Sequence, residues 1–159
     1  MASRLSPDPE PERPRPWYAD GLRFECRTDC GACCSDHGEY GYLYLEDRDV
    51  ERLARFFGCD PARFRKRYTG LDDGRPVLAL NGPDCPFLRG TCCAVYPVRP
   101  TQCRTFPFWR ENLGSPEDWE RLSEFCPGIG TGEHHDLEAI RRDIEARKPW
   151  SAAAARESS

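Results

Sequence analysis

The stretch Phe24–Cys34 reads FECRTDCGACC and places four cysteines within nine residues. A second stretch, Cys85–Trp109, reads CPFLRGTCCAVYPVRPTQCRTFPFW and adds four more, and Cys126 opens a CPGIG turn. Packing alone does not require thiols gathered in this way, whereas zinc and iron–sulfur clusters both take cysteine thiolates as ligands. The two stretches therefore predict a metal site made from separated parts of the chain, with the first group of sulfurs close to the second.

The 159-residue chain has the length of one ordinary domain, and its hydrophobic share of 38% is low for a globular protein. Ten cysteines beside so thin an apolar core indicate a fold held by disulfides or by metal. The first residues lack the apolar run of a secretory signal, and no stretch has the length of a membrane span. We therefore expect a cytoplasmic protein with no membrane association, in which reduced thiols bind metal. A disulfide framework in an exported protein is the alternative.

The formal net charge of −4 argues against nucleic acid as a partner and leaves an unknown protein partner open. Basic residues cluster at Arg63–Arg67, which the sequence places on the solvated face of a helix. The sequence contains no phosphate-binding glycine loop, serine nucleophile elbow or pair of catalytic carboxylates. Catalytic residues are therefore not predicted.

Composition divides the chain into three parts. Residues 1–16 form a proline-rich, charged leader that is expected to be disordered, and residues 149–159 form a flexible tail. Residues 17–148 form the cysteine-cluster metal-binding domain. The expected fold class is α+β: a small, loop-rich single domain with about four helices around a cysteine-bound metal core.

Capping residues and apolar periodicity predict the helices. Apolar residues at helical spacing between Val50 and Phe57 mark one of them, and Asp-Pro and Ser-Pro pairs place an N-cap and a first-position proline at two others. The expected ranges are Glu46–Phe57, a helix beginning at Asp60-Pro61, Ser115-Pro116 to about Phe125, and Asp136–Arg147.

Three short strands are expected, at Leu22–Phe24, Tyr42–Leu45 and Val77–Leu80, the last of them after a turn at Asp73-Gly74. Prolines between Cys85 and Pro107 exclude a long helix there and leave room for one helical turn after Pro100.

Cys26, Cys30 and Cys33 are spaced closely enough to face one centre from a single loop, and Gly31 eases the turn between them. The side chains of Cys33 and its neighbour Cys34 diverge. The pair therefore serves two metals, binds a polynuclear cluster, or includes one buried thiol. Cysteine ligands by themselves do not separate zinc from an iron–sulfur cluster.

Arginines and histidines near the cysteines are secondary candidates. Four arginines lie beside cysteines in sequence and could offset the negative charge of a four-thiolate site: Arg27, Arg89, Arg99 and Arg104. Arg99 and Arg104, in the proline-framed loop, are the stronger two. The cysteines suffice as ligands, so the three histidines are expected at the surface or in capping roles: His37, His134 and His135.

The ordered set FECRTDCGACC, CPFL, CAVYPVRPTQCRTFPFW and CPGIG resembles the YkgJ-like cysteine-cluster family over about Leu22–Ile144. That family is described as zinc- or iron-chelating and is often named as an iron–sulfur oxidoreductase. A related cluster domain occurs in flagellin lysine N-methylases, although nothing in this chain matches an added methyl-transfer domain. The resemblance implies eight metal ligands: Cys26, Cys30, Cys33, Cys34, Cys85, Cys93, Cys103 and Cys126.

Other parts of the family pattern also have counterparts in this chain. Its RP and CR-FP elements match Arg99-Pro100 and Cys103–Pro107, and its D-x-x-R-L-A helix matches Asp49–Ala54. Its C-x-(I/V)-Y element matches Cys93–Tyr96, which makes Cys92 an extra thiol. Cys59 also lies outside the pattern, and we expect it to be a buried free cysteine.

The resemblance implies a metal-binding protein that carries an iron–sulfur cluster or zinc, with iron–sulfur slightly favoured. A redox or protein-modification role, as in an iron–sulfur oxidoreductase, goes with it. The alternatives are a zinc-stapled interaction module without catalysis and a metal-handling protein. Eight cysteines could form two four-cysteine sites, or one cluster plus buried thiols.

Overall fold

The structure is a computed structural model, and it describes residues 13–35, 43–80 and 82–147. Within these ranges the chain forms five α-helices and two short 3-10 turns, η1 (Ala32–Cys34) and η2 (Tyr96–Val98). The helices are α1 (Asp47–Phe56), α2 (Pro61–Tyr68), α3 (Thr101–Thr105), α4 (Pro116–Leu122) and α5 (Leu137–Ala146).

Three antiparallel sheets of two strands each complete the described fold. The pairs are β1 (Leu22–Phe24) with β6 (Ile129–His135), β2 (Thr69–Asp72) with β3 (Arg75–Leu78), and β4 (Leu88–Arg89) with β5 (Cys92–Cys93). The expected α+β class, a small loop-rich single domain, is confirmed. Most of the expected leader and all of the expected tail lie outside the described residues, at 1–12 and 148–159.

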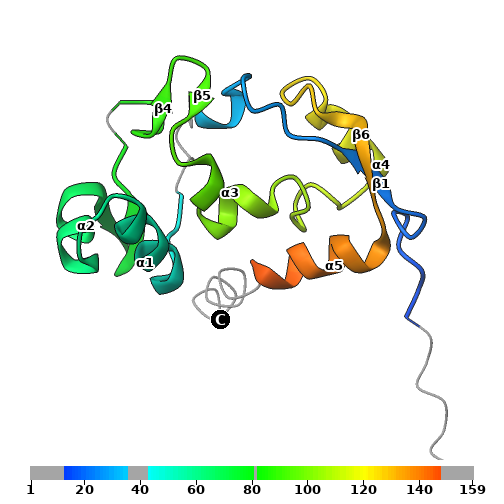
Figure 1. Cartoon of the computed structure of the whole chain (residues 1–159). Helices are drawn as coiled ribbons and strands as arrows, with labels where there is room; N and C mark the ends of the chain where they lie inside the picture. Colours follow the sequence, from blue (N-terminus) through cyan, green and yellow to red (C-terminus); the bar gives the residue numbers. More distant parts are fainter. Residues whose placement is uncertain (1–12, 36–42, 81, 148–159) are drawn as a thin grey trace, which may run out of the picture.

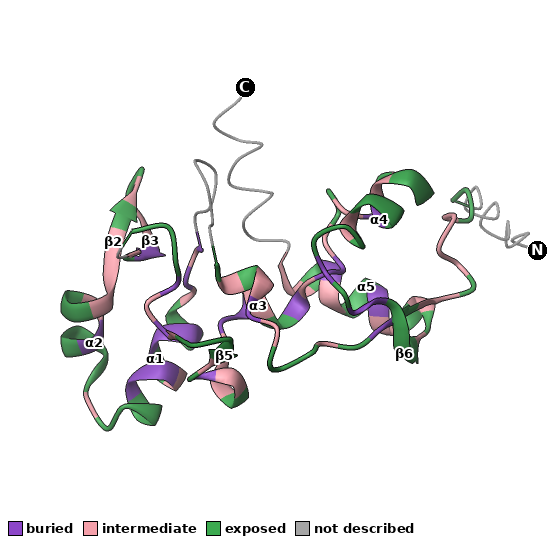
Figure 2. Cartoon of the chain, turned by 90° about the horizontal axis from the view of Figure 1, so that it is seen from above, coloured by how far each residue is buried: buried purple, intermediate pink, exposed green. Residues whose placement is uncertain are grey.

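The buried apolar side chains form two separate groups. The first subcore consists of Leu43, Leu45, Val50, Leu53, Ala54, Phe64, Leu78, Cys85, Phe87 and Val95. The second subcore consists of Phe24, Phe108, Leu113, Trp119, Cys126, Ile129, Ile140 and Ile144. In Figure 1, α1 and α2 lie at one end of the molecule, β1, β6 and α4 lie at the other, and α3 lies between them. Figure 2 shows buried positions at both of these ends and also on α3 between them, where Thr101 and Thr105 are buried.

The helix starts follow the predicted caps. Asp60 accepts a hydrogen bond from the Arg63 amide at 2.8 Å, and Asp136 does the same for Ala139 at 2.8 Å. The Ser115 hydroxyl accepts one from the Asp118 amide at 3.1 Å. These bonds satisfy amides that have no partner within the helix, which is why short polar residues at these positions start helices.

The structure corrects the predicted ends of two elements. Helix α4 ends at Leu122, three residues before the predicted Phe125, because the chain tightens into a turn whose amides include the Cys126 N–H bonded to the Leu122 carbonyl at 2.7 Å. Strand β3 begins at Arg75 instead of Val77, because Asp73 and Gly74 both take positive φ angles, 49° and 77°, and close a two-residue hairpin.

The structure also corrects the predicted strand Tyr42–Leu45. Tyr42 lies outside the described residues, and Tyr44 makes a single bridge to Val77. Leu43 and Leu45, on either side of it, are buried in the first subcore. The Leu45 amide donates to the Pro76 carbonyl at 3.0 Å and the Leu43 carbonyl accepts from the Leu78 amide at 2.8 Å, so the described part of the predicted strand pairs with β3 over one bridge. Along the described residues, no helix combines the length and the apolar character needed to cross a membrane.

A buried carboxylate joins α1 to the loop that carries the later cysteines. Asp49 is 0% exposed, and its Oδ1 accepts hydrogen bonds from the amide and hydroxyl of Thr101 at 3.0 and 2.8 Å. Arg52 donates both to Asp49 and to the Arg99 carbonyl. The Asp-x-x-Arg spacing on α1 therefore fixes where α3 begins, and with it the position of Cys103.

We expect Asp49→Asn to lower the free energy of unfolding by about 2–3 kcal/mol, because it weakens several hydrogen bonds to one buried charge. Asp47→Asn is the matched control. Asp47 lies in the same helical turn, but its carboxylate is 87% exposed in its ion pair with Arg65, so the loss should stay below about 1 kcal/mol. Urea unfolding of the two variants measures the difference. Equal losses would show that the Asp49 network does not hold α3.

Candidate metal centre

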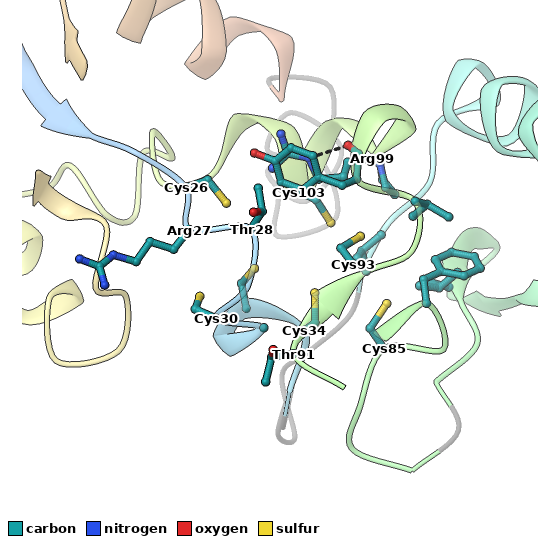
Figure 3. A pocket seen from close by; sticks show the side chains of 18 residues that line it. Cys26, Arg27, Thr28, Cys30, Cys34, Cys85, Thr91, Cys93, Arg99 and Cys103 are labelled. Atoms are coloured by element: carbon teal, nitrogen blue, oxygen red, sulfur yellow. Dashed lines mark hydrogen bonds between the residues drawn. The ribbon is translucent and has the colours of Figure 1, made fainter. Parts of the chain in front are cut away.

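Seven of the eight predicted ligand cysteines line one cavity, with a volume of about 50 Å³. They are Cys26, Cys30, Cys33, Cys34, Cys85, Cys93 and Cys103. Figure 3 shows sulfurs from the N-terminal loop facing sulfurs from the later stretch across this space. The predicted convergence of the two cysteine stretches is thus confirmed, although the assignment of these residues as metal ligands stays a prediction.

The N-terminal cysteines reach the cavity through a tight turn. Gly31 takes a φ of 59° and starts η1, and the Cys34 amide donates back to the Gly31 carbonyl at 3.0 Å. A Cβ on Gly31 would lie 3.0 Å from the Thr91 carbonyl oxygen, so a side chain there would push against the β4–β5 hairpin. Gly31 is therefore needed both for the left-handed backbone and for the close approach of the two cysteine stretches.

The later cysteines are delivered by short pieces of regular structure. The Cys85 amide donates to the Cys34 carbonyl at 2.8 Å, which ties the two stretches directly together. In β5, Cys93 lines the cavity whereas Cys92 is exposed and does not, as expected for neighbours on a strand. Cys103 is carried by α3 and packs against the first subcore.

The Cys34 thiol lies within hydrogen-bond reach of three other cysteines, although its single proton can be donated to only one of them at a time. These contacts lower the pKa of Cys93 to about 6 and of Cys33 to about 7, and also lower the pKa of Cys85. The same bonds raise the pKa of Cys34, which holds the proton. Burial raises the pKa of Cys103. Cys33, Cys85 and Cys93 therefore lose their protons more readily than free cysteines, and the thiolate is the form that a metal ion binds.

Of the four candidate arginines, Arg99 lies beside the thiols in the way predicted. Its guanidinium lies 3.8 Å from the Tyr96 ring centre and donates to the Tyr96 carbonyl at 3.0 Å, and its charge helps to lower the pKa of Cys33 and of Cys93. Arg27 also lines the cavity, but Figure 3 shows its side chain extending away from the sulfurs.

The other two arginines do not have the predicted role. Arg89 is exposed and donates to the carbonyls of Pro86 and Leu88. Arg104 does not line the cavity, and its pKa is lowered first by burial and then by the charges of Arg52 and Arg48.

Cys126 does not line the cavity. It is buried in the second subcore, and Cys26 packs against that subcore from the cavity side. Its pKa is raised by burial first, and then by the charges of Cys30, Cys33 and Cys26. Cys126 is therefore close to the thiols of Cys26, Cys30 and Cys33, but it lies within the second subcore and not in the cavity wall.

The histidines take structural roles where they can be seen. His134 Nε2 donates to the Asp20 carbonyl and His135 Nε2 donates to the Phe24 carbonyl, each at 2.9 Å, which fastens β6 to β1. His37 lies outside the described residues. Cys59 is partly buried against the first subcore and does not line the cavity, in keeping with the prediction of a packed thiol.

Tyr96 also lines the cavity, although the sequence marks it only as the last residue of the family's C-x-(I/V)-Y element. The Arg99 guanidinium packs over its ring, and its hydroxyl is hydrogen-bonded with the Cys26 thiol. The spacing Tyr-x-x-Arg directly after Cys93 is the signal that could have identified it, because η2 brings both side chains to the cavity.

The donor set fits a thiophilic metal. All ten cysteines are free thiols, and the described residues that line the cavity include no carboxylate, so zinc or iron is favoured over calcium or magnesium. Across the described ranges, no group of three or more histidine, cysteine or acidic side chains is already arranged to hold an ion.

A protein-family model matches residues 25–127, well over half of the chain. The family is named CxxCxxCC and is described as a "putative zinc- or iron-chelating domain". The chain belongs to this family. In this chain three residues separate Cys26 from Cys30, and two separate Cys30 from Cys33. The match spans every predicted ligand from Cys26 to Cys126, and no solved structure matches the chain.

Proposed function

We propose that this chain binds zinc or iron through thiolates of the eight predicted ligands, and that the bound metal holds its two subcores together. One observation carries the proposal: seven of these cysteines, from segments far apart in sequence, line a single cavity. Side chains of the first subcore, such as Phe87 and Val95, line the same cavity as Cys26, which packs against the second.

The energetic argument follows from the small size of the subcores. Metal–thiolate binding contributes on the order of 10 kcal/mol in small metal domains, and that free energy becomes folding free energy. Such a contribution, placed between the two subcores, would add to the stability of both. Arg99 would offset part of the negative charge of a thiolate-bound metal, as its effect on Cys33 and Cys93 indicates.

An iron–sulfur cluster is our first choice of metal group, and a redox or protein-modification role goes with it. The structural support is a second cavity of about 220 Å³ that shares Cys33 and Cys103 with the first and is walled by Phe106, Trp109 and Phe125. A partner molecule in this aromatic cavity would lie directly against the thiols. The cluster would supply one-electron chemistry, and its potential would depend on the hydrogen bonds and burial around the sulfurs.

A zinc-stapled interaction module without catalysis is the second candidate. Its support is the exposed aromatic pair Phe56 and Phe57, 47% and 39% exposed, at the end of α1 and outside the lining of the cysteine cavity. Such side chains are frequent in surfaces that bind other proteins. In both cases we propose a cytoplasmic location, because every cysteine is a free thiol and none is paired in a disulfide.

Purification without oxygen, followed by metal analysis and a visible spectrum, tests the proposal. We expect a brown protein with iron and acid-labile sulfide, whose visible absorption bleaches on reduction and returns on oxidation. A colourless protein with stoichiometric zinc would instead favour the interaction module. A reduced, folded protein that holds neither metal would exclude both candidates.

A further inference from the structure

The cysteines around the cavity divide between the two subcores. Cys34, Cys93 and Cys103 pack against the first subcore, of which Cys85 is a buried member. Cys26 packs against the second subcore, of which Cys126 is a buried member. In Figure 3, Cys34, Cys85 and Cys93 lie together on one side of the cavity and Cys26 and Cys30 lie on the other.

The neighbouring pair Cys33 and Cys34 lies at the boundary between these groups. Both belong to η1, where three residues make one turn, so their side chains leave the backbone about 120° apart. Cys34 turns to the first subcore. Cys33 belongs to neither subcore, is exposed, and also lines the second cavity, which Cys34 does not. One mononuclear tetrahedral centre would have difficulty in using both thiols.

We propose that the eight cysteines form two four-thiolate centres, with Cys33 and Cys34 in different ones. The first centre consists of Cys34, Cys85, Cys93 and Cys103, and the second consists of Cys26, Cys30, Cys33 and Cys126. This partition rests on the proposed metal binding and adds to it the number of centres and the ligands of each. It gives every predicted ligand a place, including Cys126, which does not line the shared cavity.

The surroundings of the two groups agree with this partition. Cys126 is a buried member of the subcore against which Cys26 packs. Three of the ligands of the first centre follow one another along Cys85–Cys103, and the Cys34 carbonyl accepts the Cys85 amide at 2.8 Å. The two centres are adjacent, since Cys33 and Cys34 are neighbours in the chain and line the same cavity.

Titration of the reduced, metal-free full-length chain with cobalt(II), without oxygen, tests the number of centres. We expect two equivalents to bind with the intense absorption of thiolate-bound cobalt. Eight cysteines should then be protected from alkylation, while Cys59 and Cys92 are modified. Saturation at one equivalent with four protected thiols would overturn the partition and leave the proposed metal binding intact. An absence of any cobalt binding would overturn the proposed function itself.

Paired variants test the membership of each centre. Cys85→Ala with Cys93→Ala should leave one equivalent of cobalt bound, and so should Cys26→Ala with Cys126→Ala. The matched control, Cys59→Ala with Cys92→Ala, should keep two equivalents. Loss of all cobalt from both test variants, with helix content retained in circular dichroism, would show that one shared cluster uses all eight thiols. If a test variant does not fold, alkylation mapping of the unaltered chain at one equivalent of cobalt decides instead. Protection of one proposed quartet supports the partition, and protection of a mixed set overturns it.

Discussion

Replacing Cys93 with serine will remove at least half of the bound metal, whereas the same replacement at Cys92 will leave the metal content unchanged. The two cysteines are neighbours on β5, so the pair compares identical chemistry at almost the same place in the fold. Cys93 lines the cavity and Cys92 is exposed outside it. Four thiolates together bind a metal with a free energy of about 10–16 kcal/mol. The loss of one thiolate therefore removes about 3 kcal/mol, which weakens metal binding at that site roughly 100-fold.

Metal content per chain in the two purified variants measures this effect, with Cys59→Ser as a further control for the loss of a packed thiol. Metal lost from the Cys92 variant but kept in the Cys93 variant would reverse the assignment of the pair. Unchanged metal in all three would contradict the cysteine cluster as a whole.

Removing the metal with a chelator will release the loop Cys85–Pro107 far more than helix α1. The sensitive amides are those whose partners bring the cysteines together, such as Cys85 N–H to the Cys34 carbonyl and Ala94 N–H to the Phe87 carbonyl. We expect their hydrogen exchange to accelerate by ~100-fold or more, because metal binding supplies much of the local stability. The Phe57 amide, which donates to the Leu53 carbonyl at the end of α1, serves as the internal reference.

Hydrogen exchange with mass spectrometry, with and without chelator, gives both rates in one experiment. Equal protection in the two states would indicate that the thiols are only packed. Equal loss at Phe57 and at Cys85 would indicate that the whole domain unfolds as a single unit when the metal is removed.

The helices were predictable because their signals are local. Asp60, Ser115 and Asp136 each satisfy an amide three residues ahead, and a first-turn proline helps two of the three, so a short window of sequence contains the whole cause. The one helical turn after Pro100 was predicted for the same reason, and α3 is that turn.

Strand β6 was missed because its cause is not local. Its sequence, IGTGEHH, has two glycines and no apolar alternation, and most of it is exposed. What makes it a strand is β1, which lies near the other end of the described chain and pairs with it across an irregular register. Strands Leu88–Arg89 and Cys92–Cys93 were missed because two residues are too few to show a period.

The sequence predicted which residues belong to the candidate site, but not how they are arranged in space. The family resemblance supplied the eight cysteines, and seven of them meet in space. The separation of Cys126 from that cavity depends on the second subcore, which is assembled from β1, α4, β6 and α5 and the loop between α3 and α4. Arg104 stays outside the cavity wall, which its place beside Cys103 in the sequence could not show.

The pairing of β1 with β6 has a consequence for the order in which the newly made chain matures. Synthesis adds Cys26, Cys30 and Cys33 early. It adds Cys126 and strand β6, which pairs with β1, only after most of the domain has been made. Every residue that lines the cavity has been made once Cys103 is reached, but β1, which precedes Cys26, still lacks its partner strand. The high sequence separation of the β1–β6 contacts also slows their formation after release. A nascent chain stalled before Cys126 therefore carries seven of the eight predicted ligands without the strand that fixes the start of the first cysteine stretch.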